Sequence, residues 1–266
     1  MVFESELILE REAGVAVVTL NRPQVHNALN ATLLGALGET IDDLSADSTV
    51  NAVVLTGAGE RSFCAGADLE ELGGLDARAA REHLRAGQAV MTRVASSRVP
   101  VISAVNGHAL GGGFELVLAT TFPVLSERAS FGLPESGLGL IPGYGGTQRL
   151  PRLVGRACAA HVMLTGERLE ARRAYELGLS PLPPVAPGEL LEVALRTART
   201  IAARGPWATA AILEALMTSS PAPALLDLES ALAGVATASA EAAEGIAAFT
   251  ERRSPVFAPR HDDSSY

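Results

Sequence analysis

Two glutamates twenty residues apart stand in the part of the sequence best suited to chemistry. Glu115 lies in an apolar run directly after a glycine triplet, Gly111–Gly113, and Glu135 closes the short sequence FGLPE. A carboxylate among apolar neighbours has its charged form disfavoured, and its pKa rises toward values that serve proton transfer. Two such carboxylates near one site are what acid–base chemistry at a carbonyl compound requires.

The glycine triplet predicts a place where bare backbone meets a ligand. An apolar, β-prone run at 101–105 leads through Asn106-Gly107 to the glycines, and an apolar, helix-like segment follows. Glycine permits close approach, and the first N–H groups of a helix have no internal partner. Taken alone, the glycines also fit a close-packed strand–helix turn, and either glutamate fits a surface or helix-start acid. The hypothesis therefore depends on these residues acting together.

The elements around these residues alternate between strand and helix, which predicts an α/β fold. We expect a β-hairpin from 7–9 and 15–20, and a helix to about residue 44 that Asn30 caps. Other expected elements are buried strands at 51–56 and 101–105 and helices at 77–96, 147–153, 156–165 and 171–177.

A proline-rich stretch at 180–188, SPLPPVAPG, is the clearest linker by composition. Three Ala-rich segments beyond it, at 189–204, 207–217 and 224–252, are expected to be helical. Their apolar faces need a partner, which is either the core of the same chain or another subunit.

Composition excludes several classes of protein. The 266-residue chain is 48% apolar and 19% charged, as in ordinary soluble proteins, and its net charge of -9 argues against binding to nucleic acid or to an anionic membrane. Its two cysteines, Cys64 and Cys158, are too few for a disulfide scaffold or a metal cluster. Because neither a signal peptide nor a long apolar run is found, we expect a soluble, cytoplasmic protein.

Motif searches exclude the common nucleotide and hydrolase sites. The chain has no lysine, so the phosphate-binding loop that ends in Gly-Lys-Ser/Thr is absent, and no Gly-x-Gly-x-x-Gly follows a strand. ATP and NAD are therefore not expected. Neither a Gly-x-Ser-x-Gly elbow nor a His-x-x-x-His pair is present, which argues against a serine hydrolase and a metal site. His108, beside the glycines, is expected to pack or to bond locally.

Taken jointly and in order, these residues resemble the enoyl-CoA hydratase/isomerase (crotonase) superfamily over nearly the whole chain. Each matching piece is weak by itself, whereas all of them in this order are specific. The pieces are Asn21-Arg22-Pro23 with NALN (27–30), FCAGADL (63–69), VNGHALGGG (105–113) with Glu115, FGLPE (131–135), IPGYGGTQRL (141–150) and FTERRSPVF (249–257).

The resemblance implies a fold and an assembly. The fold is a spiral of β-β-α units, with residues 1–188 as the spiral core that holds the active site. Residues 189–266 are expected to be a helical region for oligomerisation and for covering the active site. The resemblance further implies a homotrimer or a dimer of trimers.

The resemblance also implies hydration of trans-2-enoyl-CoA to 3-hydroxyacyl-CoA, the chemistry of fatty-acid β-oxidation. The backbone N–H groups of Ala67 and Gly112 would hold the thioester carbonyl. Glu115 and Glu135 would bind water and move protons, with the division of roles left open, and the N–H of Gly143 would lie near that water. Contacts to coenzyme A map onto Ala28, Ala65, Asp68 and Leu69. No metal or redox cofactor is implied, since coenzyme A is part of the substrate.

Other activities stay open at this point. One is an enoyl-CoA isomerase, and another is a biosynthetic dehydratase or decarboxylase acting on CoA-bound or carrier-bound acyl groups. Retention of both glutamates favours a hydratase, because other relatives often keep only one or move it. A non-enzymatic RNA-binding role is disfavoured by the net charge and the lack of lysine. Without lysine, Arg252 or Arg253 would have to contact the CoA phosphates.

Overall fold

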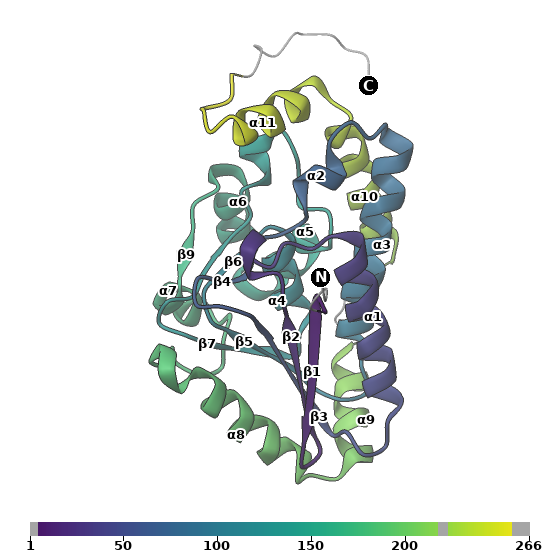
Figure 1. Cartoon of the computed structure of the whole chain (residues 1–266), viewed down its shortest axis with the longest axis vertical. Helices are drawn as coiled ribbons and strands as arrows, with labels where there is room; N and C mark the ends of the chain where they lie inside the picture. The colour runs from purple at the N-terminus through teal and green to yellow at the C-terminus, as the bar shows by residue number, and fades with distance from the viewer. Residues whose placement is uncertain (1–4, 218–222, 257–266) are drawn as a thin grey trace.

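Two β-sheets carry the candidate site, and the chain passes between them repeatedly (Figure 1). The structure is a computed structural model that describes residues 5–217 and 223–256. The first sheet contains, in spatial order, β1 (Leu7–Glu12), β2 (Val15–Leu20), β3 (Ala52–Gly57), β5 (Val101–Val105) and β7 (Phe122–Leu125). The second contains β4 (Ser62–Cys64), β6 (His108–Leu110), β8 (Ser130–Gly132) and β9 (Leu169–Glu170).

The chain adds one strand to each sheet in turn. β3 is followed by β4, β5 by β6, and β7 by β8, and a helix follows each such pair. Pairing within both sheets is parallel except for β1 with β2 and β8 with β9. This arrangement is the spiral of β-β-α units that the sequence predicted, and that prediction is confirmed.

Eleven α-helices complete the described part of the chain. They are α1 (Ala31–Ala46), α2 (Leu69–Leu72), α3 (Ala77–Ala95), α4 (Gly112–Ala119), α5 (Gly146–Val154), α6 (Arg156–Thr165), α7 (Ala171–Glu176), α8 (Leu190–Ala202), α9 (Pro206–Met217), α10 (Pro223–Thr237) and α11 (Ala240–Thr250). Short 3-10 helices cover η1 (Pro23–Val25), η2 (Glu135–Leu138) and η3 (Pro187–Glu189). Side-chain caps start the long helices: Asn30 accepts from the N–H of Leu33 at 2.8 Å, and Asp76 from that of Ala79 at 2.8 Å.

Beyond the exposed edge strand β1, the five-stranded sheet is buried on both faces because helices cover each side. One face, with Val18, Leu55 and Val105, belongs to the main core with α1 and α3. On the opposite face, Val54 and Ile102 pack with α8 (Figure 1). Successive residues of each strand point to opposite faces of the sheet. Because both faces are covered by helices, the sequences of these parallel strands are continuously apolar rather than alternating.

Two features differ from the sequence predictions, and a third settles an alternative that they left open. The strands β4 and β6 were not predicted, because three residues are too few to show an alternating pattern. The strand that leads directly into the glycine triplet is therefore β6, whereas the sequence analysis expected the run at 101–105, which is β5. The helix expected over 224–252 is two helices, because the Ser239 side chain accepts from the N–H of Ala242 at 3.1 Å and starts α11. α8 finds its apolar partner in the core sheet.

Within residues 5–217 and 223–256, no helix has both the length and the apolar character needed to span a bilayer.

Candidate active site

Glu115 lies in the first turn of α4 and is 1% exposed. Its Oε1 accepts from the backbone N–H groups of Tyr144 at 2.8 Å and Gly146 at 2.7 Å. In the described part of the chain its hydrogen bonds all go to Oε1, which leaves Oε2 to exchange a proton. Burial raises the pKa of Glu115 well above its ordinary value, and the nearby carboxylates of Glu229 and Glu135 add to the rise.

Glu135 opens η2, and its side chain reaches toward the start of α4. A Cβ built on Gly111 would lie 3.1 Å from Glu135 Oε1. The residue as a whole is half-buried, but its Oε2 is covered and has no hydrogen-bond partner among the described residues. Burial raises the pKa of Glu135 to about 8; its own backbone N–H opposes the rise, and the charge of Glu229 adds to it. The structure thus brings together two carboxylates that the sequence places twenty residues apart.

The backbone N–H groups of Ala67 and Gly112 lie beside each other. A Cβ built on Gly112 would be 3.3 Å from the Ala67 nitrogen, and one built on Gly66 would be 3.3 Å from the Gly112 nitrogen. Gly112 is the first residue of α4, where N–H groups have no helical acceptor. Neither N–H has a hydrogen bond to any residue in the described ranges. The pair can therefore bind an oxygen that carries developing negative charge.

Two loops that lie side by side hold the residues expected to contact coenzyme A. The N–H of Leu29 donates to Gly66 at 2.8 Å, that of Asp68 donates to Leu29 at 3.0 Å, and that of Ala65 donates to His26 at 3.0 Å. This pairing places Ala28, Ala65, Asp68 and Leu69 along one strip, and all four stay partly exposed while Leu29 and Gly66 are buried.

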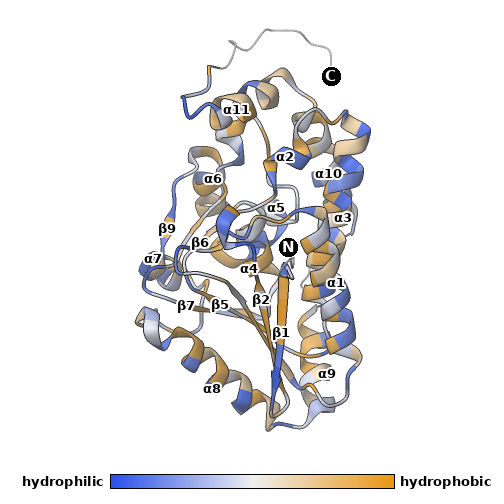
Figure 2. Cartoon of the chain, viewed as in Figure 1, coloured by the Kyte–Doolittle hydropathy of each residue, from blue (hydrophilic) through white to orange (hydrophobic). Residues whose placement is uncertain are grey.

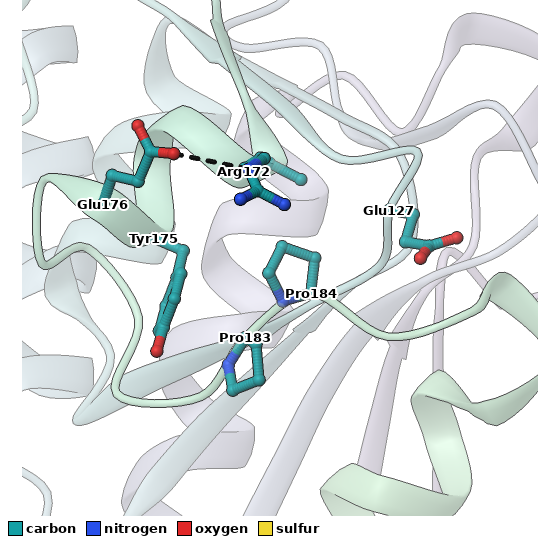
Figure 3. A pocket seen from close by; sticks show the side chains of 7 residues that line it. Glu127, Arg172, Tyr175, Glu176, Pro183 and Pro184 are labelled. Atoms are coloured by element: carbon teal, nitrogen blue, oxygen red, sulfur yellow. Dashed lines mark ion pairs between the residues drawn. The ribbon is translucent and has the colours of Figure 1, made fainter.

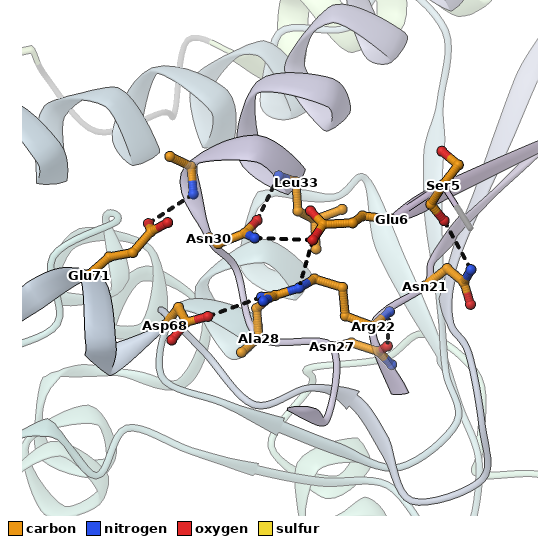
Figure 4. A network of polar contacts seen from close by, with 11 residues as sticks. Ser5, Glu6, Asn21, Arg22, Asn27, Ala28, Asn30, Leu33, Asp68 and Glu71 are labelled. Atoms are coloured by element: carbon orange, nitrogen blue, oxygen red, sulfur yellow. Dashed lines mark hydrogen bonds and ion pairs between the residues drawn. The ribbon is translucent and has the colours of Figure 1, made fainter. Parts of the chain in front are cut away.

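A polar network underneath fixes these loops (Figure 4). Arg22 Nη1 donates to the Ala28 carbonyl at 2.6 Å and to Asp68 Oδ2 at 3.1 Å, and its Nε lies 3.1 Å from Glu6 Oε1. The carboxylate of Asp68 is engaged by Arg22 and also caps α2, and its backbone carbonyl accepts from the N–H of Glu71 at 3.1 Å. Glu71 accepts from the N–H of Ala31 at 2.9 Å and ties α2 to α1.

The turn 142–147 lies beside Glu115, and the sequence analysis predicted a role for only one of its groups, the N–H of Gly143. The N–H of Gly143 has no acceptor in the described ranges, while its carbonyl accepts from Gln88 Nε2 at 3.0 Å. The Tyr144 ring packs so closely on Gly112 that a Cβ there would lie 2.9 Å from two ring carbons, and it leaves no space for a side chain at Gly87. The Tyr144 hydroxyl is buried without a hydrogen-bond partner among the described residues.

Glu229, on α10, is a third buried carboxylate at the same turn and was not predicted. It is 2% exposed and accepts from the N–H groups of Gly145 and Thr147. Burial raises its pKa, which the hydrogen bonds to Thr147 partly offset. In the sequence it resembles a surface glutamate of an Ala-rich helix, and only the packing of α10 on α3 brings it inside.

Two other expectations concern basic residues. His108 Nδ1 lies 2.8 Å from Ser130 Oγ, a local bond across two neighbouring strands, as expected. Arg253 is engaged by Glu244 at 2.6 Å and by Glu251 at 2.6 Å, which leaves Arg252 as the better candidate for a phosphate contact. No group of three metal-binding side chains occurs within the described ranges.

Two surface hollows lie away from these residues. A hollow of about 270 Å³ lies between α7 and the proline-rich segment (Figure 3), lined by Glu127, Ala171, Arg172, Tyr175, Glu176, Pro183 and Pro184. A second, of about 330 Å³, lies between α1 and α3. Neither is lined by Glu115, Glu135 or the paired N–H groups, so the chemistry of the side chains identifies the site.

Comparison with known proteins gives the same family as the motifs. The family model described as enoyl-CoA hydratase/isomerase matches residues 10–260. The chain belongs to the enoyl-CoA hydratase/isomerase family. A family member named crotonyl-CoA hydratase, from Syntrophomonas wolfei, is 38% identical over 261 residues, covering 97% of this chain and 99% of that protein. The short-chain-enoyl-CoA hydratase of Clostridium acetobutylicum is 44% identical over 204 residues, or 77% and 78% of the two chains.

A solved structure from the same family shows the same fold. EchA1_1 from Mycobacterium paratuberculosis superposes with a TM-score of 0.85 at 37% sequence identity, covering 95% of this chain and 98% of that one. The region that matches the enoyl-CoA hydratase/isomerase family includes every candidate site residue described above, Glu229 among them.

Proposed function

We propose that the chain is an enoyl-CoA hydratase, a hydro-lyase that adds water in the syn sense to trans-2-enoyl-CoA to give 3-hydroxyacyl-CoA. The observation that carries the proposal is the convergence of Glu115, Glu135 and the N–H groups of Ala67 and Gly112 at the start of α4. The names of the relatives from S. wolfei and C. acetobutylicum support it.

In this proposal the Ala67 and Gly112 N–H groups bind the thioester oxygen. Attack of water on the β-carbon moves an electron pair onto that oxygen and forms an enolate. Donors that are already in place need no reorganisation as the charge develops, and each typically contributes about 3 kcal/mol. Coenzyme A would lie along the strip of Ala28, Ala65, Asp68 and Leu69, mostly on backbone groups.

The two glutamates take different roles in the proposal. Two backbone N–H groups hold Glu115 Oε1 and oppose the rise that burial and the neighbouring carboxylates give its pKa. In the proposal the ionised form of Glu115 takes the proton of the attacking water, which the N–H of Gly143 orients. Glu135, with a pKa of about 8, is protonated near neutral pH and gives its proton to the α-carbon. Both return to their starting states by proton exchange with solvent. No oxidation state changes overall, so no redox cofactor is proposed, and protein groups supply the acid, the base and the oxyanion donors.

We further propose a homotrimer or a dimer of trimers that works in the cytoplasm in fatty-acid oxidation. In this proposal residues 1–188 form the catalytic core and residues 189–266 the oligomerisation region. Large apolar side chains lie exposed on the last three helices, whose ribbons mix orange stretches with pale and blue ones in Figure 2: Trp207, Ile212, Leu232, Val235 and Phe249. A second copy of the chain would bury such a surface. We propose no nucleic-acid or membrane partner.

The test is the loss of the conjugated-enoyl absorbance of crotonyl-CoA with purified protein, with the product identified. Wild type runs beside Glu115→Gln and Glu135→Gln, and each variant should lose about 10²- to 10⁴-fold in kcat, since each removes one proton-transfer group. A 3-enoyl product would indicate an isomerase instead. Absence of turnover with crotonyl-CoA and with a longer 2-enoyl-CoA would reject the hydratase proposal.

A further inference from the structure

The turn that begins α5 lies between two buried carboxylates. Its backbone N–H groups go alternately to Glu115, from α4 on one side, and to Glu229, from α10 on the other. The four bonds are Tyr144 to Glu115 at 2.8 Å, Gly145 to Glu229 at 2.6 Å, Gly146 to Glu115 at 2.7 Å and Thr147 to Glu229 at 3.0 Å. Three of these N–H groups, those of Gly145, Gly146 and Thr147, are ones that a helix start leaves without internal partners, and carboxylate oxygens satisfy all four.

The other contacts of Glu229 show that the carboxylate is fully engaged. Its Oε1 also accepts from Gln88 Nε2 at 3.2 Å, and its Oε2 accepts from the Thr147 hydroxyl in a short hydrogen bond. Gln88 Nε2 also donates to the carbonyl of Gly143 at 3.0 Å, so one side chain of α3 contacts both Glu229 and the turn. We call the hydrogen bonds that Glu229 and Gln88 make to this turn the clamp. A carboxylate has about four lone-pair sites, and here four donors fill them.

Glu229 makes no ion pair with any described residue. The guanidinium of Arg149 acts on Glu229 at longer range, and a buried carboxylate without a close ion pair destabilises a fold unless it satisfies donors that would otherwise be unpaired. The donors that Glu229 satisfies belong to the turn that holds Glu115. Therefore the residue stabilises a specific backbone geometry at the reacting groups, although it is itself on the far side of that turn.

We propose that Glu229 is a positioning residue for the reaction: it holds the turn 143–147 in the one geometry in which that turn also holds Glu115. Without the carboxylate, Gly145 and Thr147 lose their acceptors, and the flexible Gly145-Gly146 pair can rotate the N–H groups away from Glu115. The inference goes beyond the two glutamates of the proposed mechanism, and its catalytic readout rests on the proposed function.

The charges around Glu115 give the proposal a pH signature. The ionisable groups that interact with it are Glu135 from η2, Glu229 from α10, and Tyr144 and Arg149 from the turn and α5. Burial, and next the carboxylate of Glu229, raise the pKa of Glu115. Removing the charge of Glu229 lowers the pKa of Glu115, so the acid limb of kcat/KM, on which the base must be ionised, moves to lower pH.

The first variant is Glu229→Gln, which keeps the shape of the side chain and removes its charge. We expect kcat for crotonyl-CoA to fall by about tenfold to a hundredfold, with KM changed less than about threefold, because the reacting groups are misplaced while the CoA contacts are intact. The matched control is Asp227→Asn on the same helix, which breaks an exposed pair with Arg85 and should leave kcat and the pH profile unchanged.

A second variant separates charge from hydrogen bonding. Thr147→Val removes the hydroxyl donor but keeps the carboxylate, so kcat should fall several-fold while the acid limb does not move to lower pH. It also carries the test if Glu229→Gln does not fold, since wild-type kcat in Thr147→Val would then contradict the clamp.

A readout independent of turnover keeps this proposal distinct from the proposed function. Protein labelled at glutamate carboxyl carbons allows Glu115 to be titrated by NMR, assigned with Glu115→Gln. A higher Glu115 pKa in Thr147→Val, which loosens the turn but keeps the charge of Glu229, supports the clamp even if wild type fails to hydrate crotonyl-CoA. A folded Thr147→Val protein with an unchanged Glu115 titration, and with wild-type kcat where wild type is active, would overturn it.

Discussion

Glu115 and Glu135 are the same residue type held in different ways, and this difference is the basis for the roles proposed for them. Glu115 is anchored through one oxygen by two N–H groups. Glu135 Oε2 is covered and lacks a hydrogen-bond partner in the described ranges. N–H donors stabilise a carboxylate, whereas an unpartnered buried oxygen favours the neutral acid. In the proposed mechanism, these different environments would therefore give one glutamate the role of base and the other the role of acid.

The raised pKa of Glu135 predicts a pH-dependent stability. In the unfolded chain this carboxyl titrates near its ordinary value of 4.5, whereas in the folded protein it titrates at about 8. Between these pH values the unfolded state binds fewer protons than the folded state. The contribution of Glu135 to the free energy of unfolding therefore falls as pH rises from about 4.5 and levels off above about 8. Glu135→Gln should remove this contribution, so its melting temperature relative to wild type should rise from pH 5 to pH 8.

Thermal unfolding by circular dichroism at half-unit pH steps measures this difference. Glu192→Gln, at an exposed position of α8, is the control and should follow wild type at every pH. If the difference in melting temperature between wild type and Glu135→Gln is the same at every pH, the Glu135 carboxyl is not held neutral in the folded protein.

At the scale of elements, the site depends on how closely the loop 64–68 approaches the start of α4. Gly66 has φ of +108°, a conformation that favours glycine, and a Cβ there would lie 2.8 Å from the Leu110 carbonyl. Gly66→Ala should therefore push the Ala67 and Gly112 N–H groups apart. We expect kcat to fall about 10²- to 10³-fold, the usual effect of losing an oxyanion donor.

A control glycine separates backbone strain from displacement of the donors. Gly178 has φ of +84°, lies beyond α7, and has no neighbouring atom within 4 Å of the position that a Cβ would take. Gly178→Ala should cost about 1–2 kcal/mol of stability with unchanged kcat. If Gly66→Ala also loses only stability, the proposed pairing of the two N–H groups as an oxyanion site is contradicted.

Tyr144 predicts a limit on the length of the acyl chain. Its ring lies against Gly112, whose N–H would hold the thioester carbonyl. We therefore predict that the ring limits the space available to a long acyl chain. Tyr144→Ala should raise kcat/KM for 2-octenoyl-CoA relative to crotonyl-CoA by at least about tenfold, because each methylene that becomes buried contributes about 0.8 kcal/mol.

Assays of both substrates with wild type, Tyr144→Ala and Tyr144→Phe decide this point. The phenylalanine variant keeps the ring and should keep the wild-type preference. An unchanged substrate ratio in a folded Tyr144→Ala protein would show that the acyl chain runs elsewhere.

Elements with a long periodic pattern could be predicted from the sequence, and short ones could not. The caps and apolar spacing of α1 and α3, and the apolar run of β5, carry enough residues to define a period. β4 and β6 have three residues each, which is too few. Glu115 and Glu135 could be selected because both lie beside glycines in an apolar stretch.

At the scale of the whole molecule, the order of the motifs identified the fold, but it did not predict which distant residues meet beneath the candidate site. Gln88 and Glu229 meet across a separation of 141 residues, on α3 and α10. Neither residue has an unusual local sequence, and a single glutamate in an Ala-rich helix, such as Glu229, is expected at the surface. Contacts of this kind come from packing between helices and leave no periodic trace.

The same helix that carries Glu229 inward carries apolar side chains outward. Leu232 and Val235 of α10 are 53% and 58% exposed, one turn apart, on a protein proposed to be a trimer. Their burial between copies would hold α10 against α3, and hence Glu229 against the turn. The double variant Leu232→Glu with Val235→Glu should therefore dissociate to a single-chain mass and lose at least about tenfold in kcat, because unpaired charges are strongly disfavoured in an apolar interface.

Size-exclusion chromatography with light scattering gives the mass, and crotonyl-CoA turnover gives the activity. Leu191→Glu, which changes an exposed leucine of α8, is the control and should keep the wild-type mass and rate. A double variant of wild-type mass would place the interface elsewhere. A folded monomer of full activity would show instead that α10 holds Glu229 in position without a neighbouring subunit.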